Sequence, residues 1–508
     1  MKNPLFEHLF KKHENSEKTF LSFVDGTSLT YGEYIRMIYE FSSSFRAMGL
    51  KPGDRISLKI EKSQYFLVVY GACIHSGLIF LPINENYTTK ELLYFLKDSE
   101  SNLLITTRQE VIQLEGKITN TDLFIETLEK DGTGSLPALA KSADYLTYPE
   151  VRNLKDIAAL LYTSGTTGRP KAAMITHENL ISNSKTLTEI WAFSSDDKLI
   201  HALPVYHTHG LFVATNVILL SSASMFFLSK FDIDIIIKLI PKSSTIMGVP
   251  TYYARLLESP KLTRKLTQDM RLIVSGSAPL TKEMSDKFFE RTGKRILERY
   301  GMTETNMISS NPYDGKRKAG SVGYPLPGIN LRICNPETGL CLPAGKVGEI
   351  EIKGKNVFRG YWRMQKETQE AFRLDGFFRT GDLGKFDNQG YIEIVGRLKD
   401  LIITGGLNVY PKEVENVLNS FVGIEESAVI GLPHDDFGES ILAVIISEKG
   451  NKLCETDVIQ YLEDNLAKYK CPKAYVSETS LPRNNLGKVL KNLLREKYRN
   501  YFTNLKKS

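Results

Sequence analysis

Residues 161–171 read Leu-Tyr-Thr-Ser-Gly-Thr-Thr-Gly-Arg-Pro-Lys and continue the apolar run 157–161. Such a run predicts a buried strand, and the glycines and hydroxyl residues after it predict a turn. Glycines let a ligand approach the backbone closely, hydroxyl groups donate hydrogen bonds to phosphate oxygens, and Lys171 adds a charged donor. This stretch therefore predicts a phosphate-binding loop that follows a strand.

The same residues have a plainer interpretation, a flexible surface hairpin, because Gly, Ser and Thr are the usual residues of exposed turns. The loop is also not the common nucleotide-binding loop of ATPases, since the spacing GxxxxGK[ST] is absent from residues 161–171. The preceding strand and the order of the residues favour the phosphate loop.

Outward from this loop, helical patterns alternate with short apolar runs. A helical pattern at residues 31–50 and strand-like runs at 55–60 and 78–83 precede the loop, and the alternation recurs over residues 234–298. Alternation of this kind predicts an α/β fold with parallel sheets covered by helices. The last 110 residues or so have their own strand and helix pattern, which predicts a small, separate α+β domain.

Length and composition support several packed units of a globular protein. The chain has 508 residues, of which 42% are hydrophobic and 24% are charged, and its net charge is +6. The charges are scattered and no long basic tract is present, so we expect no nucleic-acid partner. Residues 211–228 lack charge, but their serines and strand-like end favour a buried helix followed by a strand over a membrane span.

Two further features concern the cellular compartment. The five cysteines lack metal-ligand spacing, and an odd number of cysteines without a recognisable disulfide framework fits a reducing cytoplasm. Residues 1–18 contain no apolar core of a secretory signal. We therefore expect a cytoplasmic protein without a membrane partner.

A wider set of motifs carries a resemblance to a known family. The stretch YTSGTTGRPKAAMITHENL at residues 162–180 is similar to the AMP-binding signature of the adenylate-forming superfamily, which contains acyl-CoA synthetases, luciferases and peptide-synthetase adenylation domains. Further motifs follow in the order of that family: YGMTE (300–304), TGDL (380–383), GRLKD (396–400), GGLNVYP (405–411) and PRNNLGK (482–488). More narrowly, HALPVYHTHGLFVATN (201–216), MGVPTYYARLL (247–257), SGSAPL (275–280) and ERYGMTETNMISSNPYDG (298–315) resemble the malonyl-CoA synthetase subfamily.

The resemblance implies the domain organisation of an adenylate-forming enzyme. Residues 1–396 would form a large N-terminal domain of layered sheets and helices that binds AMP and the acid. Residues 397–400 would be a hinge that pivots at Lys399, and residues 401–508 a mobile domain with the catalytic lysine.

The resemblance also implies an activity, an ATP-dependent acid:CoA ligase that forms an acyl-adenylate and then a thioester. A carboxylate and a triphosphate are both anionic, so cations and amides should dominate such a site. Lys488 would stabilise the charge of the adenylation step. Glu304 would hold Mg²⁺, which prefers oxygen ligands, and Thr303 would lie beside the α-phosphate. Phosphate and nucleotide contacts are expected from Thr163, Ser164, Gly165, Thr166, Thr167, Gly168, Lys171, Gly276, Ser277, Ala278, Glu298, Tyr300, Asp382 and Arg397.

For the acid, the resemblance implies malonate or methylmalonate. Arg255 would pair with the second carboxylate, with help from Ser275, His207 and Met302, and Gly405, Gly406 and Leu407 would line the path of coenzyme A. Apolar residues flank Arg255 within residues 249–257 and indicate an element whose side chains reach an interior. Taken alone, however, Arg255 is the kind of arginine that lies on a helix surface and pairs with Glu258 at i+3.

Three alternatives stay open. A ligase for fatty or aryl acids would use the same machinery without a cation in its acid pocket. A peptide-synthetase adenylation domain is disfavoured because no carrier-domain sequence follows Lys488, whereas a free-standing version of such a domain stays possible. A non-catalytic nucleotide-binding module is disfavoured by the presence of Lys488, Glu304 and Asp382.

Overall fold

The computed structural model describes residues 2–118, 122–143, 145–163, 170–405, 407–434, 437–448, 453–484 and 487–502. The chain divides into two compact units. The N-terminal unit comprises Met1–Asn330 and Ile352–Phe378, and the C-terminal unit comprises Leu331–Glu351 and Arg379–Ser508. Residues 379–400 thus belong to the C-terminal unit, whereas the sequence predicted a division at 397–400. The role of that segment as a hinge stays a prediction.

Within the described residues, a six-stranded sheet supports the segment predicted to bind phosphate. Its strands lie in the order β6 (Phe124–Thr127), β5 (Leu103–Thr106), β3 (Arg55–Lys59), β4 (Ile79–Pro82), β7 (Ile157–Thr163) and β8 (Lys171–Thr176). All pairs are parallel except β7 with β8, which form an antiparallel hairpin. The predicted phosphate loop therefore connects an edge strand to its neighbour.

A second sheet, nine-stranded within the described residues, carries the candidate acid site. Its order is β15 (Tyr324–Pro325), β14 (Asn306–Ser310), β13 (Leu297–Met302), β12 (Leu272–Ser275), β11 (Thr245–Gly248), β9 (Lys198–His201), β10 (Ser224–Phe227), β1 (Thr19–Ser22) and β2 (Ser28–Thr30). Strands β9, β11, β12 and β13 run parallel to one another. Their carboxyl ends meet at one edge, where ligands of open α/β sheets bind.

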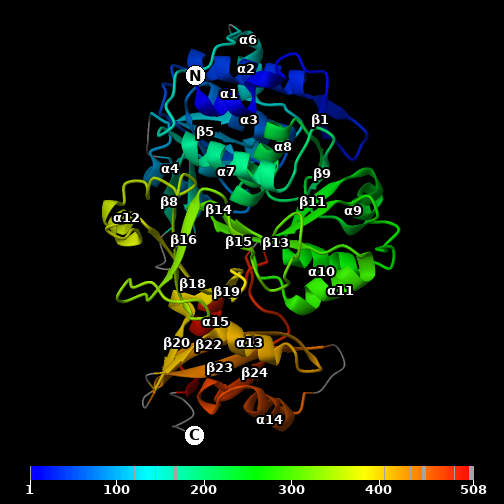
Figure 1. Ribbon diagram of the computed structural model, residues 1–508. Coiled ribbons are helices and arrows are strands. Elements are labelled where there is room, and N and C mark those ends of the chain that lie inside the picture. Colours follow the sequence, from blue (N-terminus) through cyan, green and yellow to red (C-terminus); the bar gives the residue numbers. More distant parts are fainter. Residues whose placement is uncertain are drawn as a thin grey trace. The chain divides into compact units, whose positions relative to one another are not determined.

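Helices cover these sheets, as Figure 1 shows. They are α1 (Pro4–Leu9), α2 (Tyr31–Ala47), α3 (Gln64–His75), α4 (Thr89–Ser99), α5 (Arg108–Leu114), α6 (Ser135–Ser142), α7 (His177–Ile190), α8 (Asn216–Ser221), α9 (Ile233–Leu239), α10 (Pro250–Glu258), α11 (Lys282–Thr292) and α12 (Gln365–Ala371). Local sequence fixes their ends: the Thr30 side chain accepts the Glu33 amide, and the Glu33 side chain accepts the Thr30 amide, so this capping box starts α2. Helices α9, α10 and α11 share one apolar core with β9 to β12.

The C-terminal unit contains a five-stranded sheet within its described residues. Strands β21 (Leu407–Val409), β20 (Ile402–Thr404), β23 (Gly438–Ser447) and β22 (Ile424–His434) follow one another, and β24 (Ala474–Ser477) also pairs with β23. Helices α13 (Pro411–Leu418) and α14 (Glu455–Asn465) pack on one face, and α15 (Lys491–Lys497) packs on the other. Strands β16 (Ile329–Cys334), β17 (Gly348–Gly354), β18 (Phe378–Phe386) and β19 (Ile392–Arg397) form a further sheet, and the unit boundaries cut through the first three.

The structure confirms the predicted α/β class. The uncharged stretch at 211–228 forms a π-helical turn (His209–Thr215), helix α8 and strand β10, as predicted except for the π-helical geometry. Among the described residues, we find no helix that is both long and apolar enough to cross a bilayer.

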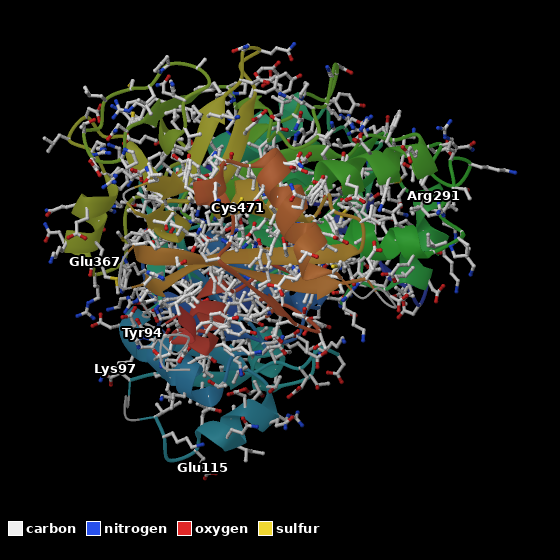
Figure 2. The ribbon with its side chains drawn as sticks, turned by 90° about the horizontal axis from the view of Figure 1, so that it is seen from below. Tyr94, Lys97, Glu115, Arg291, Glu367 and Cys471 are labelled. Carbon is white, nitrogen blue, oxygen red and sulfur yellow. The ribbon has the colours of Figure 1, made fainter. Side chains whose placement is uncertain are left out.

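Charged side chains of both signs lie on the surface. In Figure 2, Lys97, Glu115 and Arg291 lie at the periphery of the molecule, and all three are exposed. They come from α4, from the residue after α5 and from α11, so the charge is spread over separate elements. This distribution agrees with the scattered charge pattern of the sequence.

Candidate active site

The β7–β8 hairpin positions the two described ends of the phosphate loop. Thr163 pairs with Lys171 across the hairpin, and the Thr163 hydroxyl donates to the Lys171 carbonyl at 3.3 Å. The loop residues Ser164, Gly165, Thr166, Thr167 and Gly168 lie outside the described residues. Their phosphate contacts stay predictions, while Lys171 is fixed at the base of the loop.

Tyr361 links Lys171 to Glu304, a connection that the sequence did not predict. The Lys171 ammonium lies 5.2 Å from the centre of the Tyr361 ring, and the Tyr361 hydroxyl donates to Glu304 Oε1 at 3.0 Å. The segment around Tyr361 reaches this place because Gly360 and Trp362 make backbone hydrogen bonds to β8. A predicted phosphate ligand thus lies over the Tyr361 ring, and the predicted metal ligand lies at the hydroxyl of the same ring.

Glu304 lies in the tight turn between β13 and β14 and is 6% exposed. Thr303 is half-buried beside it in the same turn. The described residues contain no cluster of three His, Cys, Asp or Glu side chains that could hold a metal ion by themselves. One buried carboxylate beside a phosphate site fits Mg²⁺, because this ion is commonly bound by one or two carboxylates plus phosphates and water.

The ends of β12 and β13 bring Ser275, Gly276 and Arg299 together. Ser275 is 1% exposed, and its hydroxyl has no hydrogen-bond partner within the described structure. A Cβ atom at position 276 would lie 2.4 Å from Cζ of Arg299, so only glycine lets this guanidinium approach. The glycine that was predicted to contact the nucleotide therefore also makes room for a cation.

Arg299 is a functional candidate that the sequence analysis missed. It is 4% exposed, and its Nε and Nη2 atoms have no partner among the described residues. Burial lowers the pKa of Arg299 to about 9. A buried cation without a counter-ion is costly in a folded protein, so this position is suited to an anionic ligand. Its signal in the sequence is a charged residue inside an otherwise strand-like run, LERYGM at 297–302.

His207 and His209 lie close enough to Arg299 to sense its charge. Burial, and then the charge of Arg299, lower the pKa of His207 to about 4 and that of His209 well below its usual range. The His209 amide donates to Nδ1 of His207 at 3.2 Å, so neutral His207 carries its proton on Nε2. His209 Nδ1 lies 3.3 Å from the Ser277 hydroxyl, and its buried Nε2 has no partner within the described structure.

The remaining nucleotide candidates line the same strand ends. Ser277 adopts a φ of 69°, a left-handed conformation that is costly for serine and is common at functional sites. Glu298 is 6% exposed and accepts the Gly320 amide at 3.0 Å, and its burial raises its pKa to about 8. Ala278, Tyr300 and Met302 are half-buried around these residues.

The structure corrects the expectation that Arg255 reaches an interior. Arg255 lies on α10, and its side chain is exposed, with the guanidinium 6.0 Å from the centre of the Phe231 ring. The buried residues of this helix are Pro250, Tyr253 and Leu256, which form a different face. The pairing of Arg255 with an acid substrate stays a prediction.

In the C-terminal unit, Asp382 and Arg397 form a close ion pair. They face each other across β18 and β19, and Arg397 Nε lies 2.6 Å from Asp382 Oδ1. Asp382 is 3% exposed. The structure thus brings together two residues that were predicted to contact the nucleotide.

Lys488 lies in the same unit, after a tight turn. The Asn484 side chain accepts the Lys488 amide at 2.9 Å, and the Asn484 amide donates to the Lys488 carbonyl at 3.0 Å. The residue as a whole is exposed, yet burial around its ammonium group, followed by repulsion from Arg397, lowers its pKa to about 8. The charges of Asp382, Lys399 and Asp400 also act on it. The predicted catalytic lysine therefore lies near the predicted nucleotide residues Asp382 and Arg397 and near the predicted hinge residue Lys399.

The hinge and coenzyme A candidates lie on neighbouring segments. Lys399 belongs to a 3-10 turn, Leu398–Asp400, in which Asp400 accepts a hydrogen bond from Arg495 at 2.8 Å. Gly405 has a φ of 56°, and Leu407 is 48% exposed at the start of β21. Gly406 lies outside the described residues.

Comparisons with known proteins agree with this arrangement. The family named AMP-binding enzyme matches residues 7–362, and the family named AMP-binding enzyme C-terminal domain matches residues 413–488. The first match covers more than half of the chain. The chain therefore belongs to the AMP-binding enzyme family.

Individual relatives and solved structures are similar to this chain over nearly its whole length. The crystal structure of ATP-bound MatB from Rhodopseudomonas palustris is 48% identical, with a TM-score of 0.96, and covers 99% of this chain and 100% of that one. Malonate–CoA ligase of Arabidopsis thaliana is 32% identical over 98% of this chain and 89% of its own length. Feruloyl-CoA synthase of an Amycolatopsis species is also 32% identical, over 93% of this chain and 94% of its own length.

The comparisons confirm the predicted superfamily, fold class and enzyme class, an AMP-forming acyl-CoA ligase that uses ATP and coenzyme A. Its substrates are small molecules. At 32% identity, relatives with an aliphatic and an aromatic acid are equally similar, so identity alone does not select the acid.

Proposed function

We propose that this ligase activates malonate, with methylmalonate as a second substrate, and converts it to the coenzyme A thioester with release of AMP and pyrophosphate. The observation that carries the proposal is the buried guanidinium of Arg299, whose Nε and Nη2 atoms have no partner within the described structure. A second carboxylate on the acid would supply the missing counter-ion. A fatty or aryl acid would leave this charge buried and unpaired, at a cost of several kcal/mol.

Hydrogen-bonding groups around Arg299 also fit a carboxylate. The Ser275 hydroxyl and His209 Nε2 are buried without partners among the described residues, so they offer hydrogen bonds to a ligand. Neutral His207 adds a donor at Nε2, because its Nδ1 accepts the His209 amide. One planar guanidinium with neighbouring donors matches the two oxygens of a carboxylate.

In the proposed adenylation step, the other carboxylate of malonate attacks the α-phosphorus of ATP, and pyrophosphate leaves. Lys171 and the loop before it hold the leaving phosphates, while Lys488 stabilises the negative charge that develops between acid and α-phosphate. Asp382 accepts hydrogen bonds from the ribose hydroxyls. Mg²⁺, held by Glu304 and the phosphates, would neutralise charge on the leaving group.

In the proposed second step, the thiolate of coenzyme A attacks the acyl carbon, the carbon–oxygen bond to AMP breaks, and AMP leaves. Gly405 and Leu407, together with Gly406, are the proposed neighbours of the pantetheine arm. A cytoplasmic location belongs to the proposal as well, because the odd number of cysteines without metal-ligand spacing fits a reducing compartment.

The test is thioester formation by the purified chain with ATP, Mg²⁺ and coenzyme A across a panel of acids. We expect malonate to give the highest kcat/KM, methylmalonate the next, and acetate, ferulate and long-chain acids much lower values. Both AMP and acyl-CoA are quantified by chromatography. A preference for a monocarboxylic acid would contradict the malonate assignment and leave the ligase class standing.

A further inference from the structure

Lys62, a residue outside the predicted site, carries a buried ammonium group. Its side chain is 8% exposed. Nζ donates to His201 Nδ1 at 2.9 Å, to the His201 carbonyl at 2.9 Å and to the Leu203 carbonyl at 2.8 Å. These three acceptors use all three donor hydrogens of an ammonium group. All the donor hydrogens of Lys62 therefore bond to His201, the last residue of β9, and to Leu203 just after that strand.

His201 extends this connection to the far end of the same segment. Because its Nδ1 accepts from Lys62, neutral His201 carries its proton on Nε2, which donates to the Gly210 carbonyl at 2.9 Å. The Thr215 hydroxyl donates to the same carbonyl at 2.9 Å. Lys62 and His201 thus hold residues 202–209 at both ends.

The held segment is a closed loop of backbone. A Cβ atom at position 210 would lie 2.2 Å from the Pro204 carbonyl oxygen, so the chain returns on itself and requires glycine there. The Tyr252 hydroxyl donates to the Ala202 carbonyl at 3.1 Å and ties the start of the loop to α10. His207 and His209, the two histidines of the candidate acid site, both lie in this loop.

We propose that Lys62 and His201 form a positioning pair that fixes the 202–209 loop and thereby sets the place of His207 relative to the acid substrate. This inference rests on the proposed function of the same site. Lys62 contacts the loop and acts through His207. A displacement of about 1 Å at such a group costs on the order of a hundredfold in rate.

The central test is a double-mutant cycle with Lys62→Met and His207→Ala, because methionine keeps the length of the lysine stem and removes its donors. We expect Lys62→Met to lower kcat/KM for malonate by about 10- to 100-fold in the wild-type background. In the His207→Ala background the same change should cost less than about threefold, since its effect passes through His207. KM for ATP should stay unchanged in all variants.

A merely structural role of Lys62 gives a different pattern. General loosening of the fold lowers the melting temperature and the fraction of active enzyme. It also lowers kcat/KM for malonate by the same factor in both backgrounds. Active enzyme is therefore counted by single-turnover formation of the acyl-adenylate. An equal loss in the two backgrounds, or a parallel rise of KM for ATP, overturns the positioning role.

His201→Gln is the second variant if Lys62→Met does not fold. A glutamine amide can replace Nε2 as donor to the Gly210 carbonyl but has no acceptor at the place of Nδ1, so Lys62 loses that hydrogen bond. We again expect a lower kcat/KM for the acid, and this loss should be small in the His207→Ala background. Wild-type kcat/KM in His201→Gln overturns the proposal. If the wild type prefers an acid other than malonate, the proposed function fails separately, and the cycle with that acid still decides the positioning role.

Discussion

Arg299 and Arg255 of the N-terminal unit lie in opposite surroundings. Arg299 is 4% exposed on β13, and two of its nitrogen atoms have no partner within the described structure. Arg255 is exposed on α10 beside Phe231. The difference shows that apolar neighbours in the sequence are a poor guide to burial on a helix, because successive residues of a helix point to different faces.

The two arginines differ more in the free-energy cost of their surroundings than in their sequence context. An exposed arginine keeps its hydration and needs no counter-ion, whereas a buried one without a partner destabilises the fold. A folded protein tolerates such a cation where an anionic ligand supplies the counter-ion. Arg299 is thus the stronger candidate for the second carboxylate of the acid, and each prediction below addresses this distinction.

Lys488→Ala should have the largest effect and should not distinguish between acids. The lysine stabilises charge only in the adenylation step, so we expect that step to slow by about a thousandfold or more for every acid. Transfer from preformed malonyl-adenylate to coenzyme A should continue at near the wild-type rate. Acid-dependent exchange of pyrophosphate into ATP measures the first step, and an equal loss in both steps would remove the assigned role of Lys488.

Arg299→Met should lower kcat/KM for malonate selectively. Removing one partner of a buried charge pair costs about 3 to 5 kcal/mol, which corresponds to roughly a hundredfold to several thousandfold. Because methionine also removes the unpaired charge from the free protein, we expect unchanged or higher thermal stability. The use of acetate or a longer monocarboxylic acid should be retained or improved. Retained malonate preference in a folded variant would exclude Arg299 as the anchor.

The sequence predicted the site unevenly, for physical reasons. Glu304, Asp382 and Lys488 lie in short motifs, so their resemblance to the family identified them as candidates at once. The proximity of Arg299 to Gly276 depends on how β12 and β13 pair, and short sequence patterns do not predict which strands pair.

Tyr361 shows the same limit over a greater distance along the chain. It meets Lys171 only because a segment nearly 200 residues away pairs with β8. By contrast, the helix predicted at residues 31–50 and the strands predicted at 55–60 and 78–83 lie within a few residues of α2, β3 and β4, because hydrophobic periodicity and caps are local signals.

Glu298→Gln tests whether Arg299 truly lacks a counter-ion in the protein. Glu298 is adjacent on β13, and successive side chains of a strand point to opposite faces. Burial raises its pKa from 4.5 to about 8, so the folded state holds a proton that the unfolded state has lost between these values. Glu298 therefore contributes a fall in the free energy of unfolding as the pH rises from about 4.5 to about 8, so the stability of the wild type relative to the glutamine variant should fall over this range.

Denaturant titrations of wild type and Glu298→Gln at several pH values measure this slope. Glutamine keeps the acceptor for the Gly320 amide, so the two proteins differ mainly in the titrating proton. If the stability of the wild type relative to Glu298→Gln stays constant or rises over this range, Glu298 is ionised in the fold. Its negative charge would then offset part of the charge of Arg299, and the need for a counter-ion from the substrate would be smaller.

Arg255→Met should have the smallest effect and gives the direct counterpart of Arg299→Met. The side chain is exposed, and interactions of exposed charges contribute about 0 to 1 kcal/mol, so we expect kcat/KM for malonate to fall by no more than about fivefold. The same acid panel and the same assay apply to both methionine variants, and KM for ATP is the internal control. A loss for Arg255→Met as large as that of Arg299→Met, again confined to dicarboxylic acids, would reverse the comparison. In that case α10 carries the anchor, as the resemblance implied, and Arg255 must leave its exposed position to reach the acid.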